Sequence, residues 1–415
     1  MARKKLSIGL FGFGCVGFGL YEVIEKTPGL NAEIKRICVK NKTKEREISI
    51  ENFTFDKNDI LNDPEINVVV ELIDDADAAF EIVSTALKNG KAVVSANKKM
   101  IAENFSELLA LQEKHNAPLL YEAAACASLP IIRNLEEYYN NDLLESIEGI
   151  VNGSTNYILT KIFNENLSFD EALQQAQELG FAESNPILDT GGFDAKYKLC
   201  ILNAHAFGII SSPSEIFNYG IDKIGELELN YAKEKGLKIK LVAQSFKSED
   251  GSIVSFVAPK FIPVENQLFG VDDVFNGVIT KTCFADKQFF VGKGAGAYPT
   301  ASAVLSDISA LSYDYRYEYK KINENEVLQA TEDTFLKVLL RHDTKYLSLF
   351  KNYFEEIEES YSNKSAAFIV GVISLENLQK TISIGQENFS FILFEAVSLA
   401  SELLLEKDFN YAYSS

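Results

Sequence analysis

The sequence predicts an α/β protein that begins with a doubly wound parallel sheet and continues with an α+β domain and a small C-terminal α+β unit. Three observations support this prediction. Short apolar strand patterns alternate with helical patterns over the first 130 residues, which is typical of repeated βαβ units. Strand patterns then follow one another directly between residues 237 and 292. Both kinds of pattern recur in residues 320–415.

The expected domains are residues 1–130, completed by about 296–318, then 131–295, and finally 320–415. In the first domain, the strands are short, rich in β-branched residues and bounded by polar turns, as in a buried sheet. They are Leu6 to Phe11, Ile34 to Val39, Val68 to Ile73, Ala92 to Ser95 and Leu119 to Tyr121, with helices at 16–25, 78–89 and 104–115. This order implies right-handed crossovers between parallel strands.

The middle domain contains neighbouring strands that short turns can join into hairpins. The turn candidates are Glu249-Asp250-Gly251 and Asp286-Lys287. The predicted strands are 145–151, 237–246, 253–262, 277–285 and 288–292, and the predicted helices are 155–165, 169–179 and 194–208. We expect the helices to cover a mixed or antiparallel sheet.

An alternating segment, Tyr313 to Tyr319, places a tyrosine at every second position. This period predicts a half-buried strand at a domain junction, and an aromatic binding platform is the alternative. Beyond it we expect strands at 335–341 and 366–373 and helices at 346–360 and 390–405.

The composition disfavours several classes of partner and site. The 415 residues are 47% hydrophobic, and 60 acidic against 40 basic side chains give a formal net charge of −20, which disfavours nucleic-acid and anionic-lipid partners. Five scattered cysteines without CxxC spacing indicate neither a disulfide framework nor a zinc site, and favour the reducing cytoplasm. Glycines between Gly9 and Gly19 interrupt what a secretory signal would need, and no apolar run reaches the roughly 18 residues of a membrane span.

A GxGxxG motif, Gly12 to Gly17, follows the first strand directly and opens a helix. The first glycine allows a tight turn, the second lets backbone amides approach a pyrophosphate, and the third allows helix and strand to pack. The helix N-terminus adds partial positive charge. The motif predicts a Rossmann-type dinucleotide site, and a glycine-rich turn without a ligand is the alternative.

The turn after the second strand indicates which dinucleotide is bound. Sites that prefer NAD usually carry an acidic residue here, which holds the ribose 2′-hydroxyl. This chain has Lys40, Lys42, Lys44 and Arg46 instead. Cations favour a 2′-phosphate, so NADP is the expected cofactor, with NAD as the second choice. A solvated basic turn is the other interpretation.

The proton donor for a carbonyl reduction is best sought among the lysines, because none of His115, His205 and His342 lies in a recognisable catalytic setting. Asp194 and Lys198 are four residues apart on one predicted helix, so they share a face. Such pairs are usually surface ion pairs. Here the helix continues with an apolar stretch, which favours burial. His205 is better explained as a packed histidine than as a proton relay.

Further polar residues lie at strand ends or helix starts. Asn97-Lys98 and Glu122 each follow a predicted parallel strand at its carboxyl end, where ligands of such sheets bind. Asn152 to Asn156 can cap the next helix, and that role accounts for them. Gly292 to Gly296 forms a second flexible loop before an apolar helix.

Six segments in order then carry a resemblance to the homoserine dehydrogenase family, which interconverts L-homoserine and L-aspartate 4-semialdehyde with NAD(P). They are GLFGFGCVG at 9–17, VVSANKKMIA at 93–102, YEAAACASLPII at 121–132, GIVNGSTNYIL at 149–159, ELGFAESNPILDTGGFDAKYKL at 178–199 and GKGAGAYPTASAVLSDI at 292–308. The resemblance covers residues 6 to about 312.

The resemblance implies roles for individual residues. Lys98 and Lys198 correspond to the two lysines at the reacting oxygen, and Glu183, Asp189 and Asp194 belong to the substrate pocket, where Glu183 and Asp194 hold the substrate ammonium. With Lys40 from the basic turn, the cofactor set is Gly12, Gly14, Cys15, Val16, Gly17, Lys40, Ser95, Asn97, Lys98 and Gly296. A sodium-like ion is implied near Glu122, Ala125 and Ala127, held mainly by backbone carbonyls. Family habit also implies a homodimer or homotetramer, with the middle sheet as the dimer surface.

The chain departs from the family pattern at several positions. Ala127-Ser128 replaces a glycine pair in the ion loop, Asn185 and Gly191 replace acidic residues, and Asp74-Asp75 replaces a glycine-rich cofactor loop. Many family members end in a regulatory ACT domain. Phe335 to Arg341 resembles the first ACT strand, but Asp343-Thr344-Lys345 lacks the expected Pro-Gly, so threonine feedback does not follow from the sequence.

The sequence therefore predicts a homoserine dehydrogenase of the aspartate pathway to threonine and methionine. We expect a neighbouring cation and partial burial to lower the pKa of the acid-base lysine toward working pH. Two alternatives stay open at this stage. One is another two-domain NADP oxidoreductase that acts on a small aldehyde or hydroxy acid, and the other is a dinucleotide-sensing regulator without turnover.

Overall fold

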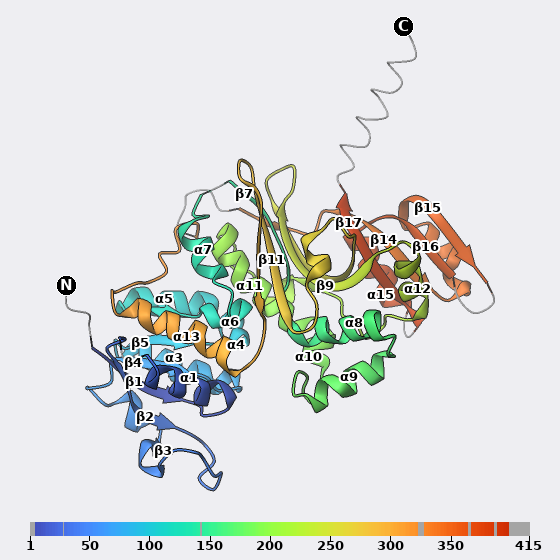
Figure 1. Ribbon diagram of the computed structural model, residues 1–415. Helices are drawn as coiled ribbons and strands as arrows, with labels where there is room; N and C mark the ends of the chain where they lie inside the picture. The colour runs from blue at the N-terminus through green and yellow to red at the C-terminus, as the bar shows by residue number, and fades with distance from the viewer. Residues whose placement is uncertain are drawn as a thin grey trace.

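The computed structural model describes residues 5–27, 29–141, 143–322, 328–363, 367–385 and 388–397. Two sheets organise these residues, and the chain passes from the first to the second and back before it enters the C-terminal strands (Figure 1). None of the described helices is long and apolar enough to cross a membrane.

The first sheet is parallel throughout and confirms the predicted fold class. Its strand order is β3-β2-β1-β4-β5-β6, the doubly wound order of a Rossmann-type domain. The strands are β1 (Leu6–Phe11), β2 (Ala32–Cys38), β3 (Phe53–Thr54), β4 (Val68–Glu71), β5 (Ala92–Ser95) and β6 (Leu119–Leu120). The order reverses between β1 and β4, and this switch point is where such sheets bind ligands.

Helices pack on this sheet as the predicted crossovers require. They are α1 (Cys15–Glu25), α2 (Asn58–Leu61), α3 (Ala76–Lys88), α4 (Lys98–Glu103) and α5 (Phe105–His115). A distant segment joins them: α13 (Ala297–Leu311) packs against α1 so closely that a Cβ on Gly19 would lie 3.2 Å from the Ala297 carbonyl oxygen. Residues near 300 therefore complete the nucleotide half of the molecule.

The second sheet is mixed, with strand order β12-β11-β7-β9-β10-β17-β14-β16-β15. Its middle strands are β7 (Leu144–Ile150), β8 (Phe217–Asn218), β9 (Lys238–Lys247), β10 (Ile253–Ile262), β11 (Phe275–Thr282) and β12 (Asp286–Lys293). The β9–β10 hairpin turns at Glu249 to Gly251, as predicted. The turn predicted at Asp286-Lys287 lies earlier in the chain. Asp286 is already paired with Thr282 in the β11–β12 hairpin, and Cys283 to Ala285 form the turn.

The helices associated with the middle strands were predicted in part. The structure has α8 (Gly153–Glu165), α9 (Phe169–Glu178) and α11 (Phe193–Phe207) close to the expected ranges. Four short helices were not predicted: α6 (Glu122–Cys126), α7 (Ile131–Glu137), α10 (Ile187–Thr190) and α12 (Glu226–Glu234). Most of the α11 side chains are buried, including Asp194 and Lys198, so this helix lies inside the protein.

The C-terminal strands continue the second sheet, and two predicted helices there are wrong. The range 346–360 is a short α14 (Leu347–Lys351) followed by β15 (Phe354–Ser362), and the described part of 390–405 is β17 (Ser390–Val397). The acidic β15 has helix-favouring residues, but it pairs with β16 at the outer edge of the sheet. The remaining elements are β13 (Ala330–Thr331), β14 (Phe335–His342), β16 (Ala367–Ser374) and α15 (Leu375–Gly385).

The C-terminal unit shares its core with the middle strands. On one side, Val254 and Phe256 of β10 cluster with Leu336 and Phe391. In another cluster, Phe261 of β10 packs with Leu339 and Ile392. A buried ion pair also crosses the boundary, from Arg341 Nε to Glu228 Oε1 at 2.6 Å. The tail therefore covers β10 and does not stand apart from it.

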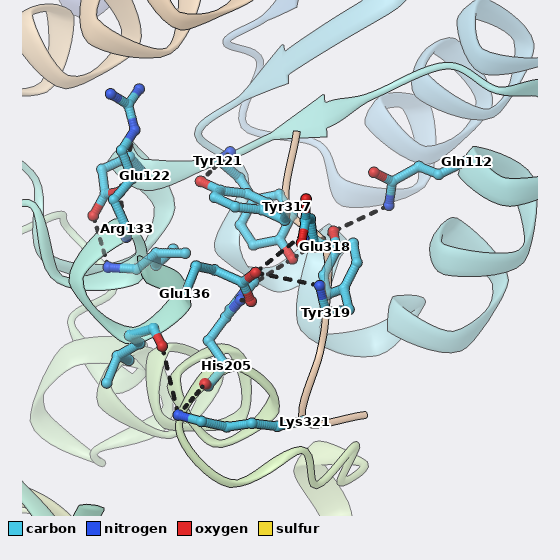
Figure 2. A network of polar contacts seen from close by, with 12 residues as sticks. Gln112, Tyr121, Glu122, Arg133, Glu136, His205, Tyr317, Glu318, Tyr319 and Lys321 are labelled. Atoms are coloured by element: carbon cyan, nitrogen blue, oxygen red, sulfur yellow. Dashed lines mark hydrogen bonds and ion pairs between the residues drawn. The ribbon is translucent and has the colours of Figure 1, made fainter. Parts of the chain in front are cut away.

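The tyrosine segment is irregular and is not a strand, because its first two residues lie in the turn after α13 and both Asp314 and Tyr319 have positive φ, so that prediction is wrong in part. The predicted alternation is present in the second half of the segment, where Tyr317 and Tyr319 are buried between exposed residues, but Tyr313 is exposed and does not follow it. Figure 2 shows the segment running between elements of both halves of the molecule, where the Tyr317 hydroxyl accepts the backbone N–H of Tyr121 and the backbone N–H of Tyr319 donates to Glu136 Oε2. It contacts the end of β6, α7 and α11.

Candidate active site

Two connected cavities lie at the carboxyl ends of the parallel strands. The smaller, of about 290 Å³, lies where both sheets contribute residues, and the larger, of about 1130 Å³, is lined by the GxGxxG loop and the basic turn. They share Val16, Leu72, Ile73 and Asp74. The smaller cavity brings together eight predicted site residues: Val16, Lys98, Ala125, Ala127, Asp189, Asp194, Lys198 and Gly296.

Two lysines meet one carboxylate in the smaller cavity. Lys98 Nζ lies 2.7 Å from Asp194 Oδ1, and Lys198 Nζ lies 2.7 Å from Asp194 Oδ2. Lys98 begins α4, which is capped by the side chain of Asn97, and the other two residues lie one turn apart on α11. The Asp194 side chain is only 6% exposed and that of Lys198 10%, so the interpretation as a surface ion pair is wrong.

The charges of this trio keep Lys98 protonated. Asp194 is the main cause of a raised Lys98 pKa, which outweighs the opposing effect of burial. Burial alone would raise the pKa of Asp194, but Lys198 and Lys98 together hold it well below its usual range. For Lys98, the expected lowering of the pKa is therefore wrong, because the adjacent anion has a stronger effect than the neighbouring cation.

Asn152, predicted only as a helix cap, also contacts both acidic residues of the cavity. Its Nδ2 donates to Asp189 Oδ1 at 2.7 Å and to Asp194 Oδ2 at 2.8 Å, while its Oδ1 accepts from the backbone N–H of Thr155 at 2.8 Å. Burial, followed by the Asp194 charge, raises the pKa of Asp189. Asp189 is in no ion pair among the described residues.

Besides Glu122, three predicted site residues lie outside the cavity walls. Glu183 is exposed, although its charge contributes to the raised pKa of Lys98. Ser95 is buried and donates to Glu71 Oε2 at 2.6 Å, and burial raises the pKa of that carboxyl to about 7. Asn97 donates to the Ile73 carbonyl at 3.1 Å. Ser95 and Asn97 therefore shape the strand ends beside the cavity.

The larger cavity has the form of a dinucleotide site. Gly12 has a φ of 93°, and a Cβ there would lie 2.4 Å from the Leu72 carbonyl oxygen, so only glycine fits. A Cβ on Gly14 would meet nothing within 4 Å, which leaves the loop backbone open to a ligand at the start of α1. Cys15, Val16 and Gly17 line the same cavity.

Cations gather at the far wall of this cavity. Lys40, Lys44 and Arg46 line it, together with Asp74 and Asp75. Lys40 Nζ lies 3.4 Å from Asp75 Oδ2, and both side chains are more than half exposed, so this pair is weak. The guanidinium of Arg46 lies 5.0 Å from the centre of the Phe53 ring, which anchors the turn.

The loop predicted to hold an ion offers main-chain oxygens but no free carboxylate. Both carboxylate oxygens of Glu122 accept backbone N–H groups, from Ile132 at 2.8 Å and from Arg133 at 3.0 Å. Figure 2 shows Glu122 beside Arg133, away from the tyrosine segment. Burial, followed by the Asp307 charge, raises the Glu122 pKa to about 8. Ala125 and Ala127 line the cavity.

A chain of hydrogen bonds holds His205 as a structural histidine (Figure 2). Gln112 accepts the backbone N–H of Leu119 through Oε1, so its Nε2 donates to the Tyr319 hydroxyl at 3.2 Å. The Tyr319 hydroxyl pairs with the Tyr121 hydroxyl at 3.1 Å, and the Tyr121 hydroxyl pairs with His205 Nε2 at 2.9 Å.

The other ring nitrogen, Nδ1, pairs with Glu136 Oε1 at 2.5 Å. Because both ring nitrogens are engaged and the residue is 1% exposed, His205 is a packed histidine, as predicted. The chain links α5, α7 and α11 to the tyrosine segment.

Comparison with known proteins agrees with this geometry. A family model described as homoserine dehydrogenase matches residues 130–309, and one described as homoserine dehydrogenase, NAD binding domain, matches residues 12–122. The chain is 37% identical over 314 residues to the homoserine dehydrogenase of Lactococcus lactis subsp. lactis, covering 73% of each protein. It is 38% identical over 313 residues to that of Helicobacter pylori, covering 74% of this chain and 73% of the relative.

Solved structures extend the similarity into the C-terminal unit. The homoserine dehydrogenase from Thiobacillus denitrificans superposes with a TM-score of 0.83 at 29% identity, over 94% of this chain and 98% of that one. A hyperthermophilic archaeal homoserine dehydrogenase in complex with NADPH superposes with a TM-score of 0.65 at 29% identity, over 76% of this chain and 99% of that one.

Proposed function

Because the chain belongs to the homoserine dehydrogenase family, whose members are oxidoreductases acting on CH–OH groups, we propose that it interconverts L-homoserine and L-aspartate 4-semialdehyde with NADP(H). We place this reaction in the cytoplasm, on the route to threonine and methionine. One observation carries the proposal: two lysines share one buried aspartate in a cavity that adjoins a dinucleotide site.

The lysine pair supplies the acid-base chemistry. The bound nicotinamide ring provides the hydride in the biosynthetic direction and accepts it in the other. Lys98 and Lys198 present their ammonium groups on either side of Asp194, so one can donate a proton to the carbonyl oxygen while the other stabilises the developing negative charge. Asp194 orients both ammonium groups and keeps Lys98 charged.

Asp189 is the carboxylate best placed for the substrate ammonium. Asp194 is already neutralised by two lysines, whereas Asp189 lines the cavity without an ion pair among the described residues. An unpaired anion in a partly buried cavity gains most from a bound cation. We therefore give Asp189 the main contact with the substrate ammonium, assisted by the more distant charge of Glu183, and assign Asp194 to the lysines.

The basic wall supports NADP as the preferred cofactor. Lys40, Lys44 and Arg46 surround the part of the larger cavity where a ribose 2′-phosphate would lie, beyond the end of β2. A similar archaeal homoserine dehydrogenase has been solved with NADPH. Gly12, Gly14, Cys15, Val16 and Gly17 would hold the pyrophosphate, and Gly296 lies beside the substrate cavity.

A monovalent cation fits the loop after Glu122 only through main-chain oxygens. The Glu122 carboxylate is occupied by backbone N–H groups, so the ligands would be the carbonyls of this loop at Ala125 and Ala127. The ion would supply local positive charge and stiffen the loop that borders the lysines. Its test is the dependence of activity on sodium or potassium at constant ionic strength.

The exposed β11–β12 hairpin supports a homodimer through the middle sheet. β12 is the last strand of its sheet, and Phe284, Phe289 and Val291 expose apolar side chains there. We expect a dimer mass by light scattering, with a homotetramer as the alternative assembly. A monomer would reject this part of the proposal.

The deciding experiment measures NADPH formation from L-homoserine, with NAD in parallel. Turnover of homoserine supports the proposed function. Turnover confined to other small hydroxy acids would identify a related oxidoreductase, and nucleotide binding without any turnover would identify a regulator.

A further inference from the structure

The geometry points to Asn152 as a positioning residue. It keeps Asp189 and Asp194 as two separate anions, and thereby fixes where Asp194 holds the ammonium groups of Lys98 and Lys198. This inference rests on the proposed function of the site. Asn152 lines the cavity, is 4% exposed and lies at the junction between β7 and α8. It reaches two acidic residues that come from different helices, α10 and α11.

The hydrogen-bonding capacity of Asn152 is fully used by this arrangement. Its amide nitrogen carries two protons, and each goes to a different carboxylate, at 2.7 and 2.8 Å. Its Oδ1 accepts the backbone N–H of Thr155 at 2.8 Å and the Thr155 hydroxyl at 2.9 Å. Because a backbone N–H can only donate, the orientation of the amide is fixed by this contact.

Electrostatics explain why a neutral double donor is needed at this point. The charge of Asp194 raises the pKa of Asp189, and the hydrogen bond from Asn152 opposes that rise. The same amide also helps hold the pKa of Asp194 low. Asp194 Oδ2 accepts from both Asn152 and Lys198, so the amide fixes the orientation of the carboxylate with which the two ammonium groups pair. Without this donor, the two aspartates would compete for protons and for the lysines.

Asn152 is also the N-cap of α8, and the two roles can be separated by one isosteric change. Asp is as good an N-cap as Asn because its carboxylate accepts the same backbone N–H. Asn152→Asp therefore keeps the cap of α8, but replaces two donated hydrogen bonds with repulsion from two carboxylates. Asn152→Ser keeps a capping oxygen, removes both donors and adds no charge.

The test compares these two variants with the wild type and with Asn266→Asp, a matched change at an N-cap remote from the cavity. Each protein is assayed for kcat and KM with homoserine and NADP between pH 6 and 9, and for its melting temperature. We expect kcat/KM for homoserine to fall roughly tenfold in Asn152→Ser and roughly 10²-fold in Asn152→Asp, with KM for NADP unchanged. Asn266→Asp should match the wild type.

The pH profile separates positioning from a merely structural role. The introduced carboxyl would be buried beside Asp189 and Asp194, which raise its pKa, while Lys98 and Lys198 oppose that rise but are already paired with Asp194. In its protonated form it can again donate one hydrogen bond. The activity of Asn152→Asp relative to the wild type should therefore recover as the pH falls. The inference is overturned if both variants keep kcat/KM within threefold of wild type, or if activity is lost only in proportion to melting temperature at every pH. Absence of homoserine turnover in the wild type would instead reject the proposed function.

Discussion

Replacement of Lys198 by alanine tests the proposed reaction most directly. The Lys198 ammonium makes two short contacts, to Asp194 Oδ2 at 2.7 Å and to the Val151 carbonyl at 2.6 Å. Lys198→Ala removes both contacts together with one of the two cations proposed to lie beside the reacting oxygen. The remaining groups stay in place, because Asp194 keeps its contacts with Lys98 and Asn152.

The expected magnitudes differ for stability and for turnover. Loss of two charge-assisted hydrogen bonds at a buried site should cost about 1–3 kcal/mol in the free energy of unfolding. Turnover should fall by roughly 10² to 10⁴-fold, which is the usual contribution of a positioned proton donor. Affinity for NADPH should stay within about twofold, because Lys198 lines only the smaller of the two cavities.

The assay follows NADPH oxidation with L-aspartate 4-semialdehyde, alongside fluorescence titration of NADPH and thermal unfolding. Lys196→Ala is the matched control, since Lys196 lies on the same helix but places its ammonium 5.0 Å from the Phe193 ring. It should lose stability without a specific loss of turnover. If Lys198→Ala turned over substrate within tenfold of the wild type, the proposed role of the lysine would be refuted.

Three other perturbations probe the cofactor wall, the domain junction and the tail. Lys40→Asp should raise the KM for NADPH more than that for NADH, since a 2′-phosphate would lose a cation and meet an anion; equal changes in both constants would show that this turn does not contact the ribose. Tyr319→Phe breaks the hydrogen-bond chain between Gln112 and His205, and should cost about 1–3 kcal/mol in urea unfolding, whereas Tyr313→Phe, at an exposed position, should cost nothing measurable. Deletion of residues 328–415 should yield insoluble protein, because it uncovers Phe256 and Phe261 of β10; a soluble, active fragment would show that the tail is a separate unit after all.

The nucleotide half could be predicted because its signals are local. The GxGxxG loop, the short apolar strands and the capped helices each depend on residues within one βαβ unit, and the structure has them in the expected order. The tail could not be predicted as well. The Ser390 to Val397 run is apolar and suits a buried helix or a buried strand equally, and only its pairing with β14 decides the matter.

The site shows the same division between local and long-range information. The spacing of Asp194 and Lys198 predicted a shared helix face, but not whether that face was buried. Asn152 was explained as a cap, and the explanation was correct but incomplete, because its second role depends on carboxylates 37 and 42 residues further along the chain. The cap uses only the side-chain oxygen of Asn152, so the sequence indicates that its NH2 group needs another partner. The sequence does not indicate which residues those partners are.

The arrangement around α11 explains why such partners matter for function. Near its start, α11 contacts the nucleotide half through the Lys98–Asp194 ion pair, and about 16 Å further along it contacts the same half again through the His205–Tyr121 hydrogen bond. A helix held at two points cannot pivot about either one. The position of Lys198, between these two contacts, is therefore determined by residues from both halves of the molecule. It follows that the proposed acid-base pair, Lys98 and Lys198, is assembled only when the halves are docked, and we expect substitutions in the distant tyrosine segment to alter kcat as well as stability.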